Sequence, residues 1–404
     1  IVTAPSIIIM GLVVAKLHFG EDVAAQVFYM QKLCCILGIT LMAQIFFGHR
    51  LPLVVGPASV LLIGILASAA SDISAIYTGI LIGGVFITVI AVSGLLTHFR
   101  KIFTPRVISV IMLLIPVTLA PTILKLGFAN DRNTAFNLAF ILLIPLILVF
   151  VNKILKGAWK STTLIWGILA GSLLVYWYDG LPDTGMISTN SSPDSLFIGF
   201  QFDWGVTLSF LFCSVALIIN EVSSIQAVGQ MLHAPDMKKR NKWGVAITGL
   251  SNILSGSMGV IGSIDYSSSV GIISSTRGAS RFPFVPTAIL LIICSFFPDL
   301  VKMLLSIPDL VMGTVMLYVM VSQFSAGMQM ITTNHAVRHF EDGAIIGLPV
   351  MAALLISFIP GEVMMEIPAL IRPICGNGFV MGVIIVLLME HLLSDKRDTK
   401  ALKP

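Results

Sequence analysis

The chain has 404 residues, of which 56% are hydrophobic and only 11% are charged, and its formal net charge is +4. Soluble domains carry roughly a quarter charged residues, so this composition excludes an ordinary soluble protein. The mean hydropathy of +0.98 and the apolar blocks of about twenty residues indicate helices that cross a hydrocarbon layer roughly 30 Å thick. The five cysteines show no disulfide or metal-binding spacing, so we expect no metal and no cofactor.

Hydropathy predicts an all-α membrane protein with fourteen spans. Seven precede the polar loop at 179–203 and seven follow it. The chain begins at Ile1 inside an apolar stretch without an initiator methionine, and we expect further residues to precede it. The predicted spans are 1–19, 26–47, 51–70, 76–96, 107–126, 135–151 and 163–178, followed by 206–232, 243–257, 260–275, 284–300, 310–322, 344–359 and 379–393.

The distribution of charge supports this number of spans. With fourteen spans, 18 of the 24 lysines and arginines fall in loops on one side, which we call the basic side, while the other side holds 12 of the 20 acidic residues. The positive-inside rule makes the basic side cytoplasmic and places both termini there, as in a multi-pass protein of the cell membrane. The same clustering in short loops indicates topology and a lipid environment, not a nucleic-acid partner.

An odd number of spans in each half forces the second half to insert upside down, which predicts two inverted seven-span repeats. Transporters built this way place the solute site at the membrane midplane, where broken helices meet. Segment 51–59 contains two prolines and a glycine, and segment 256–271 is rich in glycine and serine at the corresponding third-span position. We therefore expect short strands leading into half-helices in spans 3 and 10, although the glycines would also permit close helix packing.

Two acidic residues, Glu221 and Asp265, lie within predicted spans. An acid at that depth is costly and normally faces a cavity, so both are candidates for ion coupling. Glu221 lies on a helix beside Asn220 and Ser224, and its alternative role is a buried acid bonded to a neighbouring helix. Asp265 has the alternative role of capping a half-helix that begins near Ser267.

Several motifs resemble the xanthine/uracil permease family, also called nucleobase/ascorbate transporters. The resemblance is carried by GLSNILSGSMG at 249–259, YSSSVG at 266–271, FGHRLPLVVG at 47–56, SIQAVG at 224–229 and IPDLVMG at 307–313.

The resemblance implies a core domain and a gate domain that move as an elevator, importing a nucleobase with protons or sodium, often as a homodimer. The core would comprise 1–98 and 205–305, and the gate 99–180 and 306–394.

The family binds the base with a carboxylate on the eighth span and a Glu or Gln followed by Asn on the tenth. Asn220 falls at the position of the eighth-span carboxylate, and Glu221 follows one residue later. Which of the two residues takes the place of that carboxylate stays open. Ser268 and Ser269 replace the tenth-span pair, and Ser59 replaces an aromatic residue of the third span. The substrate-binding residues expected from this pattern are Ala58, Ser59, Asn220, Glu221, Ser224, Tyr266, Ser267, Ser268 and Ser269.

A serine hydroxyl cannot form the pair of hydrogen bonds that a carboxylate or carboxamide makes with a nucleobase. A small anion such as bicarbonate, sulfate or a carboxylate is therefore an alternative substrate. A channel is a further alternative, since it needs only a lined pore. No H-E-x-x-H or P-loop motif is present, so we do not expect an enzyme. The histidines, His49 among them, fall mostly at span ends, where solvated interfacial positions are expected.

Overall fold

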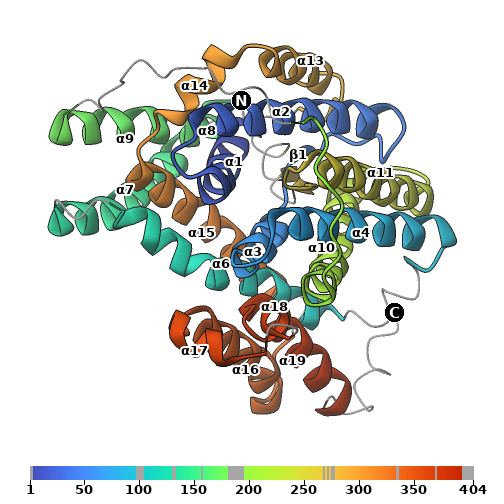
Figure 1. Cartoon of the computed structure of the whole chain (residues 1–404). Coiled ribbons are helices and arrows are strands. Elements are labelled where there is room, and N and C mark those ends of the chain that lie inside the picture. The colour runs from blue at the N-terminus through green and yellow to red at the C-terminus, as the bar shows by residue number, and fades with distance from the viewer. Residues whose placement is uncertain are drawn as a thin grey trace.

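The computed structural model describes residues 3–96, 104–129, 133–155, 158–180, 195–266, 269–270, 273, 278–333, 336–368 and 371–393. Within these residues the chain is mainly helical, with one two-stranded sheet (Figure 1). The elements are α1 (Thr3–Phe19), α2 (Val23–Phe46), β1 (Val54–Pro57), α3 (Ser59–Ala67), α4 (Ile73–Ser93), α6 (Pro105–Gly127), α7 (Thr134–Ile154), α8 (Ala158–Ser161), α9 (Thr163–Asp179), α10 (Trp204–Met231), α11 (Met237–Met258), β2 (Ser263–Tyr266), α13 (Phe284–Ser295), α14 (Pro298–Leu305), α15 (Asp309–Thr333), α16 (Phe340–Ser357), α17 (Gly361–Glu366), α18 (Arg372–Cys375) and α19 (Gly378–Leu393).

Side-chain caps fix where several of the long helices begin. Asp22, Asp72 and Asp203 accept hydrogen bonds from the first-turn amides of α2, α4 and α10, and Thr104 does the same for α6. Each cap satisfies an amide that has no partner within its own helix. The polar residues that interrupt the apolar blocks therefore define the helix starts.

Seven of the described helices are long and apolar enough to cross a membrane, or eight if α13 and α14 form one broken span. The chain bends by 91° between those two helices, so the predicted span 284–300 is not one straight helix. The helices α1 and α19 are apolar but shorter. The protein is an integral membrane protein with a mostly helical fold.

The predicted short strands in the third and tenth spans are present. β1 and β2 pair antiparallel, and β1 leads directly into the nine-residue helix α3. In Figure 1, β1 lies between α2 and α11, and α16 to α19 gather at the opposite end of the molecule. The strand pair is almost completely buried, so its backbone groups are shielded from lipid.

Helices α4 and α11 approach each other closely through small residues. A Cβ added at Gly249 would lie 2.7 Å from the backbone nitrogen of Thr88, and one at Gly84 would lie 2.6 Å from that of Ile253. Small residues that bring backbones together are the usual basis of tight helix packing in membranes. This contact joins the first half of the chain to the second.

A buried ionic cluster joins three further helices. Arg106 at the start of α6 lies 2.8 Å from Asp342 of α16 and 3.1 Å from Glu390 of α19. Thr104 also donates a hydrogen bond to Glu390. Since α6 packs against α15 and α16, these elements form one connected group.

We predict that Gly249→Ala destabilises the fold by about 1–3 kcal/mol, because the added methyl group must separate two packed backbones. The matched control is Gly347→Ala in α16, where an added Cβ meets no atom within 4 Å. That variant should be neutral or slightly stabilising, since alanine favours helix more than glycine does. Thermal unfolding of both purified variants measures the difference, and equal melting temperatures would contradict the close-packing role of Gly249.

Candidate functional site

The strand pair organises the candidate site. Val55 lies opposite Asp265, and Val54 lies opposite Tyr266. The Tyr266 hydroxyl donates a hydrogen bond to the carbonyl oxygen of Pro57 at 2.8 Å, and its ring fills the space where a Cβ on Gly56 would stand. Only glycine fits at this position of β1.

The N-terminus of α3 emerges from this sheet. Ala58 occupies the N-cap position, is fully buried, and donates its amide hydrogen to Gly262 O at 2.9 Å. Alanine has no oxygen with which to cap a helix, and no side-chain cap is present. The first amides of α3, beginning at the partly buried Ser59, are therefore available to an anion or a carbonyl oxygen.

Glu221 is fully buried in α10 and is held by two hydrogen bonds. Thr248 of α11 donates its hydroxyl to Oε1 at 2.8 Å, and the amide of Asp265 in β2 donates to Oε2 at 2.9 Å. The side chain thus points toward α11 and β2 and bridges the eighth, ninth and tenth predicted spans. This matches the alternative considered above, a buried acid bonded to neighbouring elements.

His49 completes this cluster, and the expectation that it is solvated was wrong. Its side chain is fully buried, and its Nε2 lies 3.0 Å from Oδ2 of Asp265. Leu51 N donates a hydrogen bond to its Nδ1 at 2.9 Å, so the ring hydrogen lies on Nε2, facing the carboxylate. Among the described residues neither oxygen of Asp265 accepts a well-aligned hydrogen bond.

The cluster continues into a buried polar network along α2 and α11. Gln44 donates to the hydroxyl of Thr248 at 2.9 Å. The hydroxyls of Thr40 in α2 and Ser251 in α11 lie 2.5 Å apart, and those of Ser251 and Ser263 in β2 lie 2.8 Å apart. This network connects the helices behind the strand pair to β2.

Asn220 differs from its neighbour Glu221 in having an unused acceptor. Its side chain is partly exposed, yet its Oδ1 atom is buried and has no hydrogen-bond partner within the described structure. Its backbone carbonyl accepts from the buried Ser224 hydroxyl at 2.9 Å. A carboxamide offers an acceptor and two donors in one plane.

Ser269 has its hydroxyl committed to the backbone. It donates to Tyr266 O at 2.6 Å and accepts from Val54 N at 3.0 Å, which ties the tenth span to β1. Ser267 and Ser268, both predicted to bind solute, lie outside the described residues.

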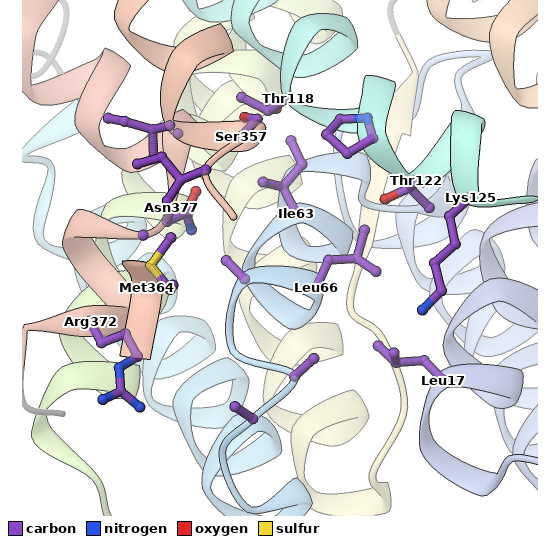
Figure 2. Close-up of a pocket in the computed structure, with 18 residues that line it drawn as sticks. Leu17, Ile63, Leu66, Thr118, Thr122, Lys125, Ser357, Met364, Arg372 and Asn377 are labelled. Atoms are coloured by element: carbon purple, nitrogen blue, oxygen red, sulfur yellow. The ribbon is translucent and has the colours of Figure 1, made fainter. Parts of the chain in front are cut away.

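A cavity of about 440 Å³ lies between α3 and the α6, α16 and α19 group. Figure 2 shows Lys125 and Arg372 on opposite sides of it, with Ile63 and Leu66 of α3 between them. Ile63 is one helical turn from Ser59, so the cavity extends along α3 from its C-terminal end toward the sheet. None of the predicted site residues that the structure describes lines it.

The sequence reasoning missed His49 and Thr248. Nothing in the sequence marks Thr248 as part of a site, because the hydroxyl of a threonine in a helix usually bonds to a backbone carbonyl of the same helix. His49 carried a weak one, since it directly precedes the irregular segment 51–59. Only the fold brings these two side chains to Asp265 and Glu221.

An irregular strand pair and half-helix buried in a membrane bundle, beside a polar cluster, are typical of membrane transporters. The chain matches the model of the xanthine/uracil permease family, described as the Permease family, over residues 2–362, and it belongs to that family. It is therefore a permease and not an enzyme.

Known proteins resemble the chain over most of its length. The nucleobase transporter PlUacP of Paenibacillus larvae is 24% identical, covering 97% of this chain and 92% of that protein. The xanthine permease XanP of Escherichia coli is 22% identical, covering 77% of this chain and 70% of that protein. The transmembrane domain of the cyanobacterial bicarbonate transporter BicA shares the fold with a TM-score of 0.59 at 14% identity, covering 95% of this chain and 96% of that one.

We predict that Thr248→Val destabilises the protein by about 1–3 kcal/mol, because it leaves Oε1 of Glu221 buried without a donor. Thr314→Val is the matched control. Thr314 is equally buried, but within the described residues its hydroxyl bonds only to Leu310 O of its own helix. Thermal unfolding should separate the two variants; equal stability would show that Glu221 does not depend on Thr248.

Proposed function

We propose that this permease imports a nucleobase of the xanthine or uracil type, as a secondary active transporter coupled to protons, with sodium as the alternative ion. Family membership and the nucleobase and xanthine specificities in the names of its relatives support this substrate class. A small molecule with paired N–H and C=O groups suits the polar groups around the strand pair.

The observation that carries the proposal is the unpartnered carboxamide oxygen of Asn220. A nucleobase edge presents an N–H donor next to a carbonyl acceptor, which matches the acceptor and donors of one carboxamide. Asn220 would take the place of the family's eighth-span carboxylate. The amides of α3 from Ser59 onward would receive a carbonyl oxygen of the base, since the amide of Ala58 is bonded to Gly262 O, and the hydroxyl of Tyr266 lies on the adjacent strand.

Glu221, Asp265 and His49 would carry the coupling ion instead of the solute. Two carboxyl groups and one imidazole share a buried site, and no lysine or arginine forms a salt bridge with either acid in the described structure. Such a group can bind and release a proton at much lower cost than it can hold two bare charges. Since Asp265 lies in β2, its protonation state would act directly on the strand pair.

We further propose the fourteen-span topology of two inverted repeats, with both termini cytoplasmic and the protein in the cell membrane as a homodimer. The core, 1–98 and 205–305, would move as an elevator against the gate, 99–180 and 306–394. The close contact of α4 with α11, the ionic cluster at Arg106 and the cavity between α3 and α6 are consistent with this division.

A small anion is the second candidate substrate. The uncapped amides at the start of α3 would bind an anion as well as a carbonyl oxygen, and the bicarbonate transporter BicA has this fold. The two hypotheses differ in the need for Asn220, since an anion bound by backbone amides does not require a carboxamide.

A thermal-shift screen of the purified protein distinguishes the candidates. We expect xanthine, uric acid or uracil to raise the melting temperature, because only ligands of the folded state stabilise it. Bicarbonate, sulfate and acetate should have no effect. Stabilisation by these anions alone would replace the nucleobase proposal with the anion one.

We expect Asn220→Ala to raise the KM for nucleobase uptake by about 5- to 150-fold, equivalent to the loss of about 1–3 kcal/mol of buried hydrogen bonding. Asn152→Ala is the control. It removes a hydrogen bond to Tyr318, at a distance from the strand pair. An unchanged KM in Asn220→Ala would remove this residue from the solute site.

Glu221→Gln should abolish proton-driven accumulation in proteoliposomes while retaining counterflow of labelled nucleobase. Glutamine keeps the shape and an acceptor but cannot exchange a proton. Glu341→Gln, at an exposed position in α16, should behave as the unmodified protein. Normal accumulation by Glu221→Gln would exclude Glu221 from coupling, and accumulation driven by a sodium gradient alone would identify the other ion.

A further inference from the structure

A second cavity, of about 420 Å³, lies where α2 ends and α11 begins. We call it the basic cavity. It shares no lining residue with the 440 Å³ cavity drawn in Figure 2. Its lining includes Phe47, Arg50, Lys239, Arg240, Trp243 and Ile247.

The charges of the basic cavity are unbalanced. Three cations line it, against one acid, Asp236, and none of the four forms a salt bridge among the described residues. Arg281 adds a further cation. Its Nη1 lies 3.4 Å from Arg50 O, which Arg240 Nη1 also approaches at 3.2 Å. Guanidinium groups gathered this closely repel one another unless an anion lies between them.

Donors remain available for such an anion. Arg240 uses Nε for Pro235 O and Nη1 for the carbonyls of His49 and Arg50, which leaves Nη2 without an acceptor in the described structure. Lys239 is exposed on the first turn of α11 and makes no hydrogen bond there. Guanidinium and ammonium groups arranged in this way bind phosphate oxygens well.

The rim of the basic cavity is apolar and aromatic. Phe47 is 70% exposed and Trp243 is 42% exposed, and Ile247 lies one turn further along α11. These residues lie at the end of two membrane helices on the basic side, where aromatic side chains meet lipid headgroups. A free phosphate would use the cations but leave this apolar wall exposed.

We propose that the basic cavity binds the phosphate of an anionic phospholipid headgroup, with the glycerol and acyl chains against Phe47 and Trp243. The lipid lies against the loop whose carbonyls Arg240 holds, and that loop carries His49. The site is independent of the solute that the permease transports.

The test uses the whole purified protein and two neighbouring lysines. Lys239→Gln removes a lining charge, while Lys238→Gln removes an equally exposed charge that does not line the cavity. Native mass spectrometry and thermal shift are measured with dioleoyl phosphatidylglycerol, with dioleoyl phosphatidylcholine, and with inorganic phosphate. Arg50→Gln serves as a second variant.

We expect saturable binding of phosphatidylglycerol but not phosphatidylcholine. Lys239→Gln should weaken it about fivefold, the loss expected for one basic residue at an anionic lipid surface. Lys238→Gln should bind as the unmodified protein does, and Arg50→Gln should resemble Lys239→Gln. Equal weakening by Lys238→Gln and Lys239→Gln, or equal binding of both lipids, would overturn the proposal. Stabilisation by inorganic phosphate to the same extent would overturn the lipid assignment in favour of a free-anion site.

Discussion

The pairing of β1 with β2 is the constraint on which the rest of the structure depends. Two stretches of non-helical backbone lie inside a membrane protein, where each unpaired amide or carbonyl costs several kcal/mol. Each strand supplies hydrogen-bond partners for the backbone of the other, with Val55 opposite Asp265 and Gly56 opposite Ile264. The pairing also brings together two segments about two hundred residues apart in sequence, and it leaves the first amides of α3 without a side-chain cap.

Two of the buried acids, Glu221 and Asp265, lie together beside the strand pair. Glu221 accepts from Thr248 and from the backbone of Asp265, and Asp265 lies against His49. The family pattern would place its carboxylate one residue earlier, where this chain has Asn220. In our proposal the two tasks are separated, so that a neutral carboxamide meets the solute and the adjacent carboxyl group holds the coupling proton.

The two cavities differ in what surrounds them. The larger one follows α3 between helix groups that we propose to move relative to each other, with Lys125 and Arg372 facing across it. The basic cavity lies at the end of α2 and α11, with exposed aromatic residues at its rim. The positive charge that sets the topology of a membrane protein therefore also creates a site that suits an anionic lipid.

Much of the architecture was determined by the sequence itself. Hydrophobic blocks indicate a membrane protein, and the motifs at 47–56, 224–229 and 249–271 identify the family. Proline and glycine in 51–59, and glycine and serine in 256–271, predicted strands where strands occur, because these residues disfavour a continuous helix. The isolated acids at Glu221 and Asp265 stood out because charge is rare at that depth.

Only the tertiary structure decided which partners those residues meet. The side chain of Glu221 points toward α11 and β2, where Thr248 and the amide of Asp265 bond to it, and the side chain of Asp265 lies against His49. His49 was expected at a solvated helix end, but it is buried next to Gly244 of α11, and Arg240 donates a hydrogen bond to its carbonyl oxygen. Sequence periodicity describes one element at a time, whereas these contacts join α10, α11 and β2 to a segment about two hundred residues earlier in the chain. Hydropathy therefore determined what lies in the membrane, and the packing around the strand pair decided which partners Glu221 and Asp265 meet there.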